Sequence, residues 1–254
     1  MWNQLHTGSY EGMIAETVSL PGCGDEPVHA YLSRPLGAGP FPGIILVPHM
    51  PGWDEWCRET ARRFTQHGYI TICPDIFDRF GHGSPVEISQ AARGAGGVHD
   101  ETVMEDCQNA LNYLQALPIS TNKVGIIGMC SGGRHAFLAA CRISGLSAAV
   151  DCWGGGVIMT PEQLTPARPV APIDYTAELS CPLLGIFGND DHSPTAEQVD
   201  NHEAELKRFS KDYEFHRYDD AGHGFWYYHS EAYRPVQAMD SWAKTFEFFS
   251  RHLK

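Results

Sequence analysis

Residues 124–133 are Val124-Gly125-Ile126-Ile127-Gly128-Met129-Cys130-Ser131-Gly132-Gly133. The β-branched residues before Gly128 indicate a buried strand, because such side chains fit a pleated surface. Residues 134–143, which follow the Gly-x-Cys-x-Gly-Gly pattern, are compatible with a helix. A nucleophile between small residues on a tight turn from strand to helix is a nucleophile elbow, here with sulfur as the reactive atom. The stretch therefore predicts a turn that presents Cys130.

This pattern alone leaves two explanations for Cys130 open. A cysteine at a glycine-rich strand end can simply be a packed thiol, whereas the N–H groups and positive dipole end of the following helix would favour a thiolate. The chemical explanation requires an acid after a later strand and then a histidine before the last helix. Both are present, since Asp190-Asp191 follows a strand predicted at 182–187 and His223 follows one at 213–218.

Composition narrows the class of protein. The chain has 254 residues, and Lys+Arg 18 against Asp+Glu 31 gives a net charge of −13, so nucleic acid and anionic membranes are not expected as partners. The apolar run 44–47 is too short to span a bilayer, and residues 1–4 show no signal-peptide pattern. The eight cysteines lack Cys-x-x-Cys spacing, which predicts reduced thiols and a cytoplasmic location.

The remaining chain alternates between predicted strands and helices. An antiparallel strand pair is expected at 12–20 and 27–34, and further strands at 44–47, 69–73 and 146–151. Helices are expected from the cap at Asp54 to about His67, over 102–117 and over 195–209, and the apolar face of the closing helix is expected to comprise Val236, Met239, Trp242, Phe246 and Phe249. This order predicts a single α/β domain over 1–254, with a mainly parallel central sheet flanked by helices on both faces.

Three segments between the predicted strands and helices have no regular pattern. Residues 76–100 are glycine-rich and are expected to be irregular. The short segment Asn122-Lys123 is expected to turn the chain into the strand before Cys130. Residues 157–180 contain four prolines and are expected to form an excursion, with a possible position near the active site as an insertion.

The chain resembles the dienelactone hydrolase (carboxymethylenebutenolidase-like) family, a cysteine-nucleophile branch of the α/β-hydrolase fold. The matching pieces are Cys73-Pro74-Asp75, Gly128-Met129-Cys130-Ser131-Gly132-Gly133, Gly188-Asn189-Asp190-Asp191 and Ala221-Gly222-His223-Gly224-Phe225. The resemblance covers roughly residues 40–250. It implies that Cys130 is the nucleophile, His223 the base and Asp191 the orienting acid, with Asp190 as the alternative acid.

This resemblance implies hydrolysis of small esters or lactones through a thioester acyl-enzyme. The oxyanion would be bound by the backbone N–H groups of Ser131, just after the nucleophile, and of Met50, in the loop after an early strand. No cofactor is expected. No metal site is expected either, because the thirteen histidines include no His-x-x-x-His or His-Glu-x-x-His pattern.

The sequence departs from the family pattern at His49, where the family has a glutamate that interacts with the resting thiol. His49 could form an ion pair with the thiolate or pack under Trp53, and whether dienelactone itself is a substrate is open. Arg79 and Arg93 are candidates for binding a substrate carboxylate. Trp53, Trp153 and Trp226 either contact substrate or simply bury area beside the crevice.

Two other functions compete with hydrolysis. One is a non-hydrolytic, thiol-based small-molecule binder or redox sensor on the same fold. The other keeps the fold but changes the reaction, for example to acyl transfer, because fold alone does not specify chemistry. The sequence leaves the oligomeric state open between monomer and dimer.

Overall fold

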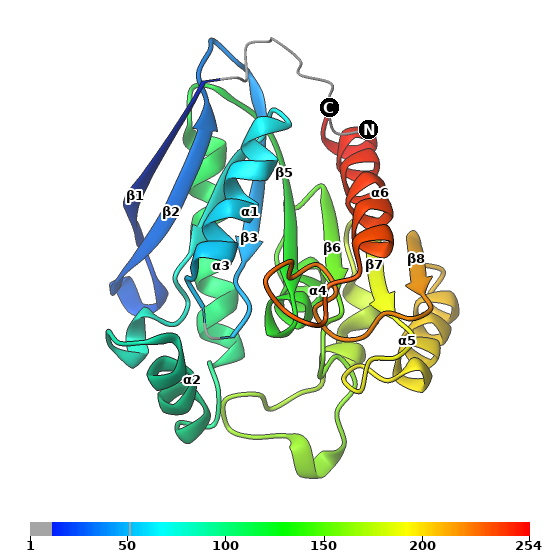
Figure 1. Cartoon of the computed structure of the whole chain (residues 1–254). Coiled ribbons are helices and arrows are strands. Elements are labelled where there is room, and N and C mark those ends of the chain that lie inside the picture. The colour runs from blue at the N-terminus through cyan, green and yellow to red at the C-terminus, as the bar shows by residue number, and fades with distance from the viewer. Residues whose placement is uncertain (1–11, 51) are drawn as a thin grey trace.

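The protein is described by a computed structural model that covers residues 12–50 and 52–254. Within these residues, eight strands form one sheet in the order β1-β2-β4-β3-β5-β6-β7-β8 (Figure 1). β1 and β2 pair antiparallel, as do β2 and β4, and all the other pairs are parallel. The strands are β1 (Met13–Pro21), β2 (Pro27–Pro35), β3 (Phe41–Val47), β4 (Ile70–Pro74), β5 (Ser120–Met129), β6 (Ala148–Cys152), β7 (Leu183–Gly188) and β8 (Tyr213–Tyr218).

Helices cover both faces of the sheet, as the sequence predicts. β3 contributes Ile45 and Val47 to one core cluster and Ile44 and Leu46 to the other, so this strand is buried on both sides. The first cluster includes residues of α3, α4 and α5, and the second includes residues of α1 and α6. The helices are α1 (Glu55–Gln66), α2 (Pro85–Gly94), α3 (Asp100–Ala116), α4 (Ser131–Arg142), α5 (Ala196–Arg208) and α6 (Pro235–Leu253), and the short 3-10 turns are η1 (Cys23–Asp25), η2 (Asp78–Phe80), η3 (Pro161–Gln163) and η4 (Pro172–Glu178).

The expectation of an irregular segment over 76–100 is wrong in part, because it contains α2. Ser84 accepts the N–H of Glu87, and the Glu87 carboxylate reaches back to the Ser84 N–H, which makes a capping box. Pro85 then occupies the first helical position. Only Ala92 of this helix is buried, so the helix has no apolar stripe that periodicity could detect.

The predicted apolar face of the closing helix is also wrong at its first turn. Val236 is 77% exposed and Met239 is 59% exposed, whereas Trp242 is 8% exposed. The indole N–H of Trp226 donates to Ser241 Oγ at 2.6 Å, and the Trp226 and Trp242 rings stack with centroids 4.0 Å apart. This contact turns Ser241 toward the core, and it leaves Val236 and Met239 in solvent.

The expected turn at Asn122-Lys123 is not where the structure begins the strand. β5 begins at Ser120, so Asn122, whose φ is 64, lies within the strand.

Residues 157–180 form the light green loop at the bottom of Figure 1. This loop packs on α4 through a hydrogen bond from the Ser180 N–H to the Ala140 carbonyl, and the N-terminus of α3 is tied to it by Asp100 N–H and the Ala167 carbonyl.

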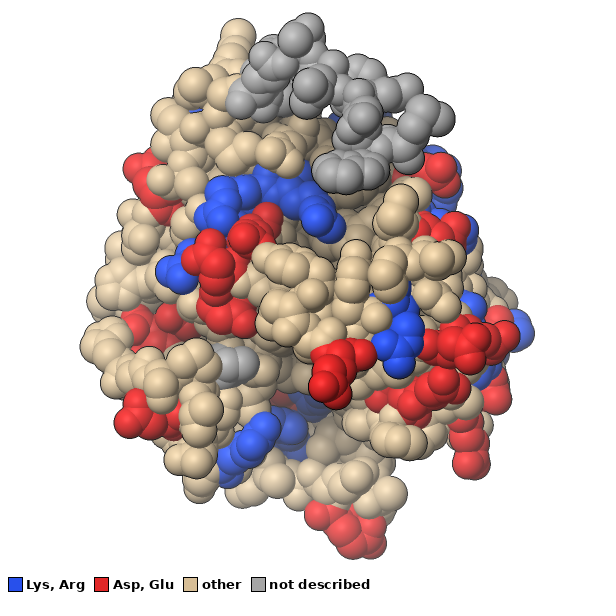
Figure 2. Space-filling view, viewed as in Figure 1, with Lys and Arg blue, Asp and Glu red and all other residues tan. Residues whose placement is uncertain are grey.

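Charged side chains are mixed over the face in Figure 2, where small groups of blue and red side chains adjoin one another. No helix in the described part of the chain is both long and apolar enough to cross a membrane. Residues 1–4, where the sequence shows no signal-peptide pattern, lie outside the described residues.

Candidate active site

The turn between β5 and α4 has the strained geometry that a nucleophile elbow requires. Cys130 has φ 57 and ψ −123, and its N–H donates to the Cys152 carbonyl at 3.1 Å. A Cβ on Gly128 would collide with the Gly132 carbonyl, and one on Gly132 would collide with the Val47 carbonyl. The glycines of the motif are therefore needed for the close approach of backbone segments. Cys130 is held at the start of α4, as the sequence predicts.

The acid and the histidine meet next to this turn. His223 Nδ1 lies 2.9 Å from Asp191 Oδ2, and the other oxygen of Asp191 accepts the Ser193 N–H at 2.8 Å. The Asp191 side chain is almost fully buried, whereas Asp190 is exposed. Of the two aspartates that the sequence offers, the structure pairs Asp191 with the histidine.

The environment of His223 favours its protonated form. Burial alone would lower the pKa of His223, but hydrogen bonds to Asp191 and Cys130 outweigh burial and raise this pKa to about 10. An imidazolium beside the sulfur stabilises negative charge on it. The imidazole of His223 therefore interacts with both the Asp191 carboxylate and the Cys130 sulfur.

The side chains of Cys130, Asp191 and His223 all line one cavity of about 400 Å³ at the carboxyl edge of the sheet. Parallel sheets of this kind bind ligands at that edge. The cavity is lined by Cys130, Ser131, Gly155, Asp190, Asp191, His192, Ser193 and His223. None of these residues belongs to 157–180, so the predicted excursion does not line the cavity.

The backbone N–H of Met50 also lies beside the elbow. It donates to Ser131 Oγ at 3.1 Å, so the residue after the nucleophile and the loop after β3 are in direct contact. The N–H of Ser131 belongs to the first turn of α4, where backbone donors have no intrahelical acceptor. The role of these two N–H groups in binding an oxyanion stays a prediction.

His49 has a partner that the sequence did not suggest. Its Nε2 atom lies 2.8 Å from Asp54 Oδ2, and its ring packs on Trp56 and Tyr227. Trp53 instead donates its indole N–H to the Cys73 carbonyl at 3.0 Å.

His49 and Asp54 form, with Cys57, the one group among the described residues that could hold a metal ion. Their ligand atoms lie within 4.8 Å of one another. Each atom already has a protein partner, because Asp54 Oδ1 accepts the Cys57 N–H and the Cys57 thiol donates to the Gly52 carbonyl. Burial raises the pKa of Cys57 well above its usual range, which disfavours the thiolate that a metal needs.

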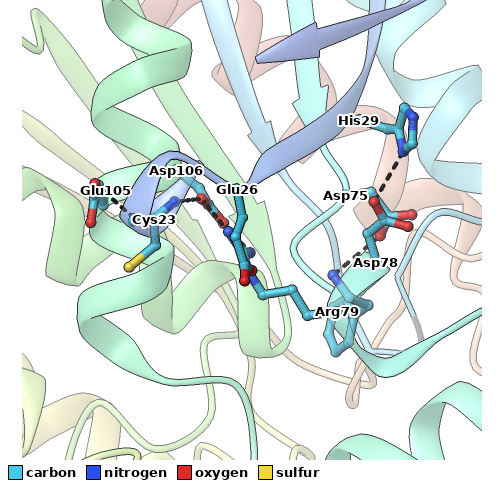
Figure 3. Close-up of polar contacts among 10 residues, drawn as sticks. Cys23, Glu26, His29, Asp75, Asp78, Arg79, Glu105 and Asp106 are labelled. Carbon is cyan, nitrogen blue, oxygen red and sulfur yellow. Dashed lines mark hydrogen bonds and ion pairs between the residues drawn. The ribbon is translucent and has the colours of Figure 1, made fainter. Parts of the chain in front are cut away.

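The two arginine candidates lie elsewhere. Arg79 forms a bidentate ion pair with the buried Asp106, at 2.7 and 2.9 Å, and extends from η2 toward the loop that contains Glu26 (Figure 3). Arg93 is exposed in the last turn of α2. Neither arginine lines the cavity at Cys130. The ion pair gives Arg79 a structural role in joining η2 to α3.

Of the three tryptophan candidates, Trp153 and Trp226 are core residues, and Trp53 is half-buried. Trp153 is fully buried with its ring 6.5 Å from that of His223, and Trp226 is 2% exposed against Trp242. The structure also adds Tyr227, whose hydroxyl is buried and whose ring contacts His49. Its only sequence signal is its place four residues after His223.

Comparison with a family model identifies the family of this chain. The model of the dienelactone hydrolase family matches residues 28–253. The chain belongs to the dienelactone hydrolase family. As a member, it is a hydrolase of ester or lactone bonds, which confirms the family and the reaction class expected from the sequence.

Relatives of this dienelactone hydrolase family member align along almost its whole length. A Yersinia pestis protein that bears the name carboxymethylenebutenolidase is 30% identical over 253 residues, which is 98% of this chain and 93% of the relative. A Bradyrhizobium protein named as a 2-oxo-3-(5-oxofuran-2-ylidene)propanoate lactonase is 27% identical over 246 residues, 95% of this chain and 98% of the relative. The crystal structure of a Klebsiella pneumoniae protein titled as a dienelactone hydrolase superimposes with a TM-score of 0.85 at 28% identity, and covers 95% of this chain and 100% of that one.

Proposed function

We propose that the protein hydrolyses small esters or lactones through a thioester at Cys130. The supporting observation is that the strained turn at Cys130 and the His223–Asp191 pair, 2.9 Å apart, open on one cavity. The size of that cavity, about 400 Å³, suits a small acyl or lactone substrate.

In the proposed first step the Cys130 sulfur attacks the carbonyl carbon of the substrate. A C–S bond forms, the carbonyl electrons move to the oxygen, and His223 holds the proton from the thiol. Collapse of this intermediate expels the alcohol oxygen, which takes the proton from His223. Asp191 keeps the imidazole in the tautomer that presents Nε2 to the sulfur, and it stabilises the imidazolium.

In the second step water releases the acid. His223 takes a proton from the water, the resulting hydroxide attacks the thioester carbonyl, and the Cys130 sulfur leaves. Both steps generate an oxyanion, which the N–H groups of Met50 and Ser131 would bind. Because the Met50 N–H donates to Ser131 Oγ at rest, the oxyanion must displace that hydroxyl. Loss of one such donor typically costs about 10²–10³-fold in rate.

The substrate is proposed as a class and not as dienelactone itself. The resemblance calls for a glutamate where His49 stands, and His49 is bound to Asp54. We further propose a reducing compartment such as the cytoplasm, because all eight cysteines are free thiols.

The test is turnover of an activated aryl ester and a small lactone by the Cys130→Ala variant, with Cys23→Ala as the control. Cys23 is also partly exposed but lies in η1, outside the site. We expect Cys130→Ala to lose turnover with an unchanged circular dichroism spectrum, and Cys23→Ala to match the wild type. Full turnover by Cys130→Ala would overturn the mechanism, and a wild-type burst with no steady release would support the thiol-based binder instead.

A further inference from the structure

The loop between β3 and α1, residues 48–54, is fixed by a hydrogen bond between two of its own side chains. His49 Nε2 lies 2.8 Å from Asp54 Oδ2. The His49 ring is 8% exposed, with the Trp56 ring centroid at 5.7 Å and that of Tyr227 at 5.0 Å. The imidazole is therefore held by one polar contact and two aromatic ones.

Asp54 uses its two oxygens for two purposes. Oδ1 accepts the Cys57 N–H at 2.9 Å and caps α1, while Oδ2 faces His49. Burial alone would raise the pKa of Asp54, but the hydrogen bonds from His49 and Cys57 outweigh it and lower this pKa, so the carboxylate is charged at neutral pH. Serine or asparagine would cap the helix as well. Capping therefore does not explain the bond to His49.

The bond to His49 acts on the residue that follows it. Met50 donates its N–H to Ser131 Oγ at 3.1 Å, and the Gly52 N–H closes a turn on the His49 carbonyl at 2.5 Å. Tyr227, against which the His49 ring packs, lies in the same loop as His223. Fixing His49 thus fixes the Met50 N–H relative to both the sulfur and the base.

We propose that His49 and Asp54 form a positioning pair that holds the Met50 N–H where the oxyanion develops. This inference rests on the proposed function, since only attack by Cys130 generates an oxyanion there. Oxyanion donors act mainly because they are in place before the reaction. A displacement of about 1 Å at such a site can cost about 10²-fold in rate.

The test uses variants that separate helix capping from the bond to His49. Asp54→Ser keeps a capping oxygen but cannot reach His49, and Asp54→Asn keeps both contacts. We expect Asp54→Ser to lower kcat by about tenfold or more with KM within about twofold, and Asp54→Asn to restore most of kcat. The affinity for a trifluoromethyl ketone, whose thiol adduct places an oxyanion at the same point, should fall with kcat.

His49→Phe supplies a second route, because it keeps the ring packing and removes only the polar contact. It should reproduce the loss of kcat, while Ser84→Ala, which removes the cap of α2 away from the cavity at Cys130, should leave kcat unchanged. Wild-type kcat and ketone affinity in both Asp54→Ser and His49→Phe would overturn the proposal. If Cys130→Ala remains active, the proposed mechanism fails instead, whatever these variants do.

Discussion

At the scale of single residues, the site depends on a histidine that keeps its proton. The pKa of His223 is raised to about 10 by Asp191 and Cys130 against the effect of burial. In the proposed mechanism the imidazolium can therefore protonate a leaving alcohol throughout the neutral range.

The first prediction concerns this titration. Cys130→Ala removes one hydrogen bond and one negative partner of His223, and should lower the pKa of His223; Asp191→Asn should lower it as well. Proton–nitrogen NMR of the imidazole as a function of pH gives the value in each variant. An unchanged His223 pKa in Cys130→Ala would show that the sulfur and the ring do not interact.

A second buried acid lies beneath the elbow. Asp151 is fully buried, and Oδ1 accepts the Gly154 N–H at 2.9 Å while Oδ2 has no hydrogen-bond partner among the described residues. Burial raises the pKa of Asp151 to about 7. The folded state thus holds a proton that the unfolded state releases from about pH 4, so this residue makes folding less favourable as the pH rises from about 4 to 7.

Asp151→Asn should therefore stabilise the protein at alkaline pH. The amide keeps an acceptor for the Gly154 N–H and has no charge to bury. We expect its melting temperature to exceed that of the wild type by a few degrees at pH 8, with the difference shrinking toward pH 5. Thermal unfolding followed by circular dichroism measures this, and an equal melting temperature at pH 8 would contradict the burial of a charged carboxylate.

At the scale of elements, how well the sequence predicts the fold depends on how much of an element is buried. β3 was predictable because residues 44–47 form a continuous apolar run, and α3 because its apolar residues repeat at helical spacing. α2 was not, since only Ala92 is buried, although Ser84-Pro85 with Glu87 is a helix-start signature that could have located it. In α6 the repeat continues through Val236 and Met239, but tertiary contacts with Trp226 decide which side faces inward.

α2 should consequently behave as an independent element. Ser84→Ala removes the hydroxyl that accepts the Glu87 N–H, which typically costs a helix about 1 kcal/mol. Because α2 buries so little, we expect faster amide exchange over residues 85–94 with an almost unchanged melting temperature. Hydrogen exchange measured by mass spectrometry reports the local opening of α2, and thermal unfolding reports the stability of the whole fold. A large drop in melting temperature would mean that α2 unfolds with the core.

At the scale of the whole molecule, the candidate site was easier to predict than its supporting contacts. Cys130, Asp191 and His223 lie in local motifs whose chain order is set by the fold. The hydrogen bond between His49 and Asp54 and the packing of Tyr227 on His49 join side chains through the folded structure, and no periodicity encodes them. The same is true of Arg79, whose partner Asp106 is 27 residues away on α3.

Stability as a function of pH is also a property of the whole molecule. His202 is buried between Phe137 and Phe215, and its Nε2 has no hydrogen-bond partner among the described residues. Burial lowers the pKa of His202 to about 3, whereas the unfolded chain protonates this histidine near pH 6.5. The contribution of His202 to stability is therefore complete above pH 6.5 and is lost as the pH falls toward 3. Asp151 acts in the opposite direction over much of this range.

His202→Leu should remove this acid sensitivity. Between pH 7 and pH 5 we expect the wild type to lose about 2 kcal/mol more of its unfolding free energy than the variant does. Urea unfolding at both pH values, repeated in the Asp151→Asn background to remove the opposing effect, measures the difference. Equal losses in wild type and variant would mean that His202 is hydrated or protonated in the folded protein.

The geometry of the elbow also limits how this scaffold can evolve. Gly128, Gly132 and Gly133 face backbone atoms or Asp151 so closely that no side chain can be added at these positions without moving the main chain. Cys130 itself faces the cavity, and its backbone conformation does not depend on which atom follows Cβ. A single codon change from cysteine to serine would thus exchange the reactive atom of the proposed mechanism on an unaltered frame, and new selectivity must come from the surrounding loops.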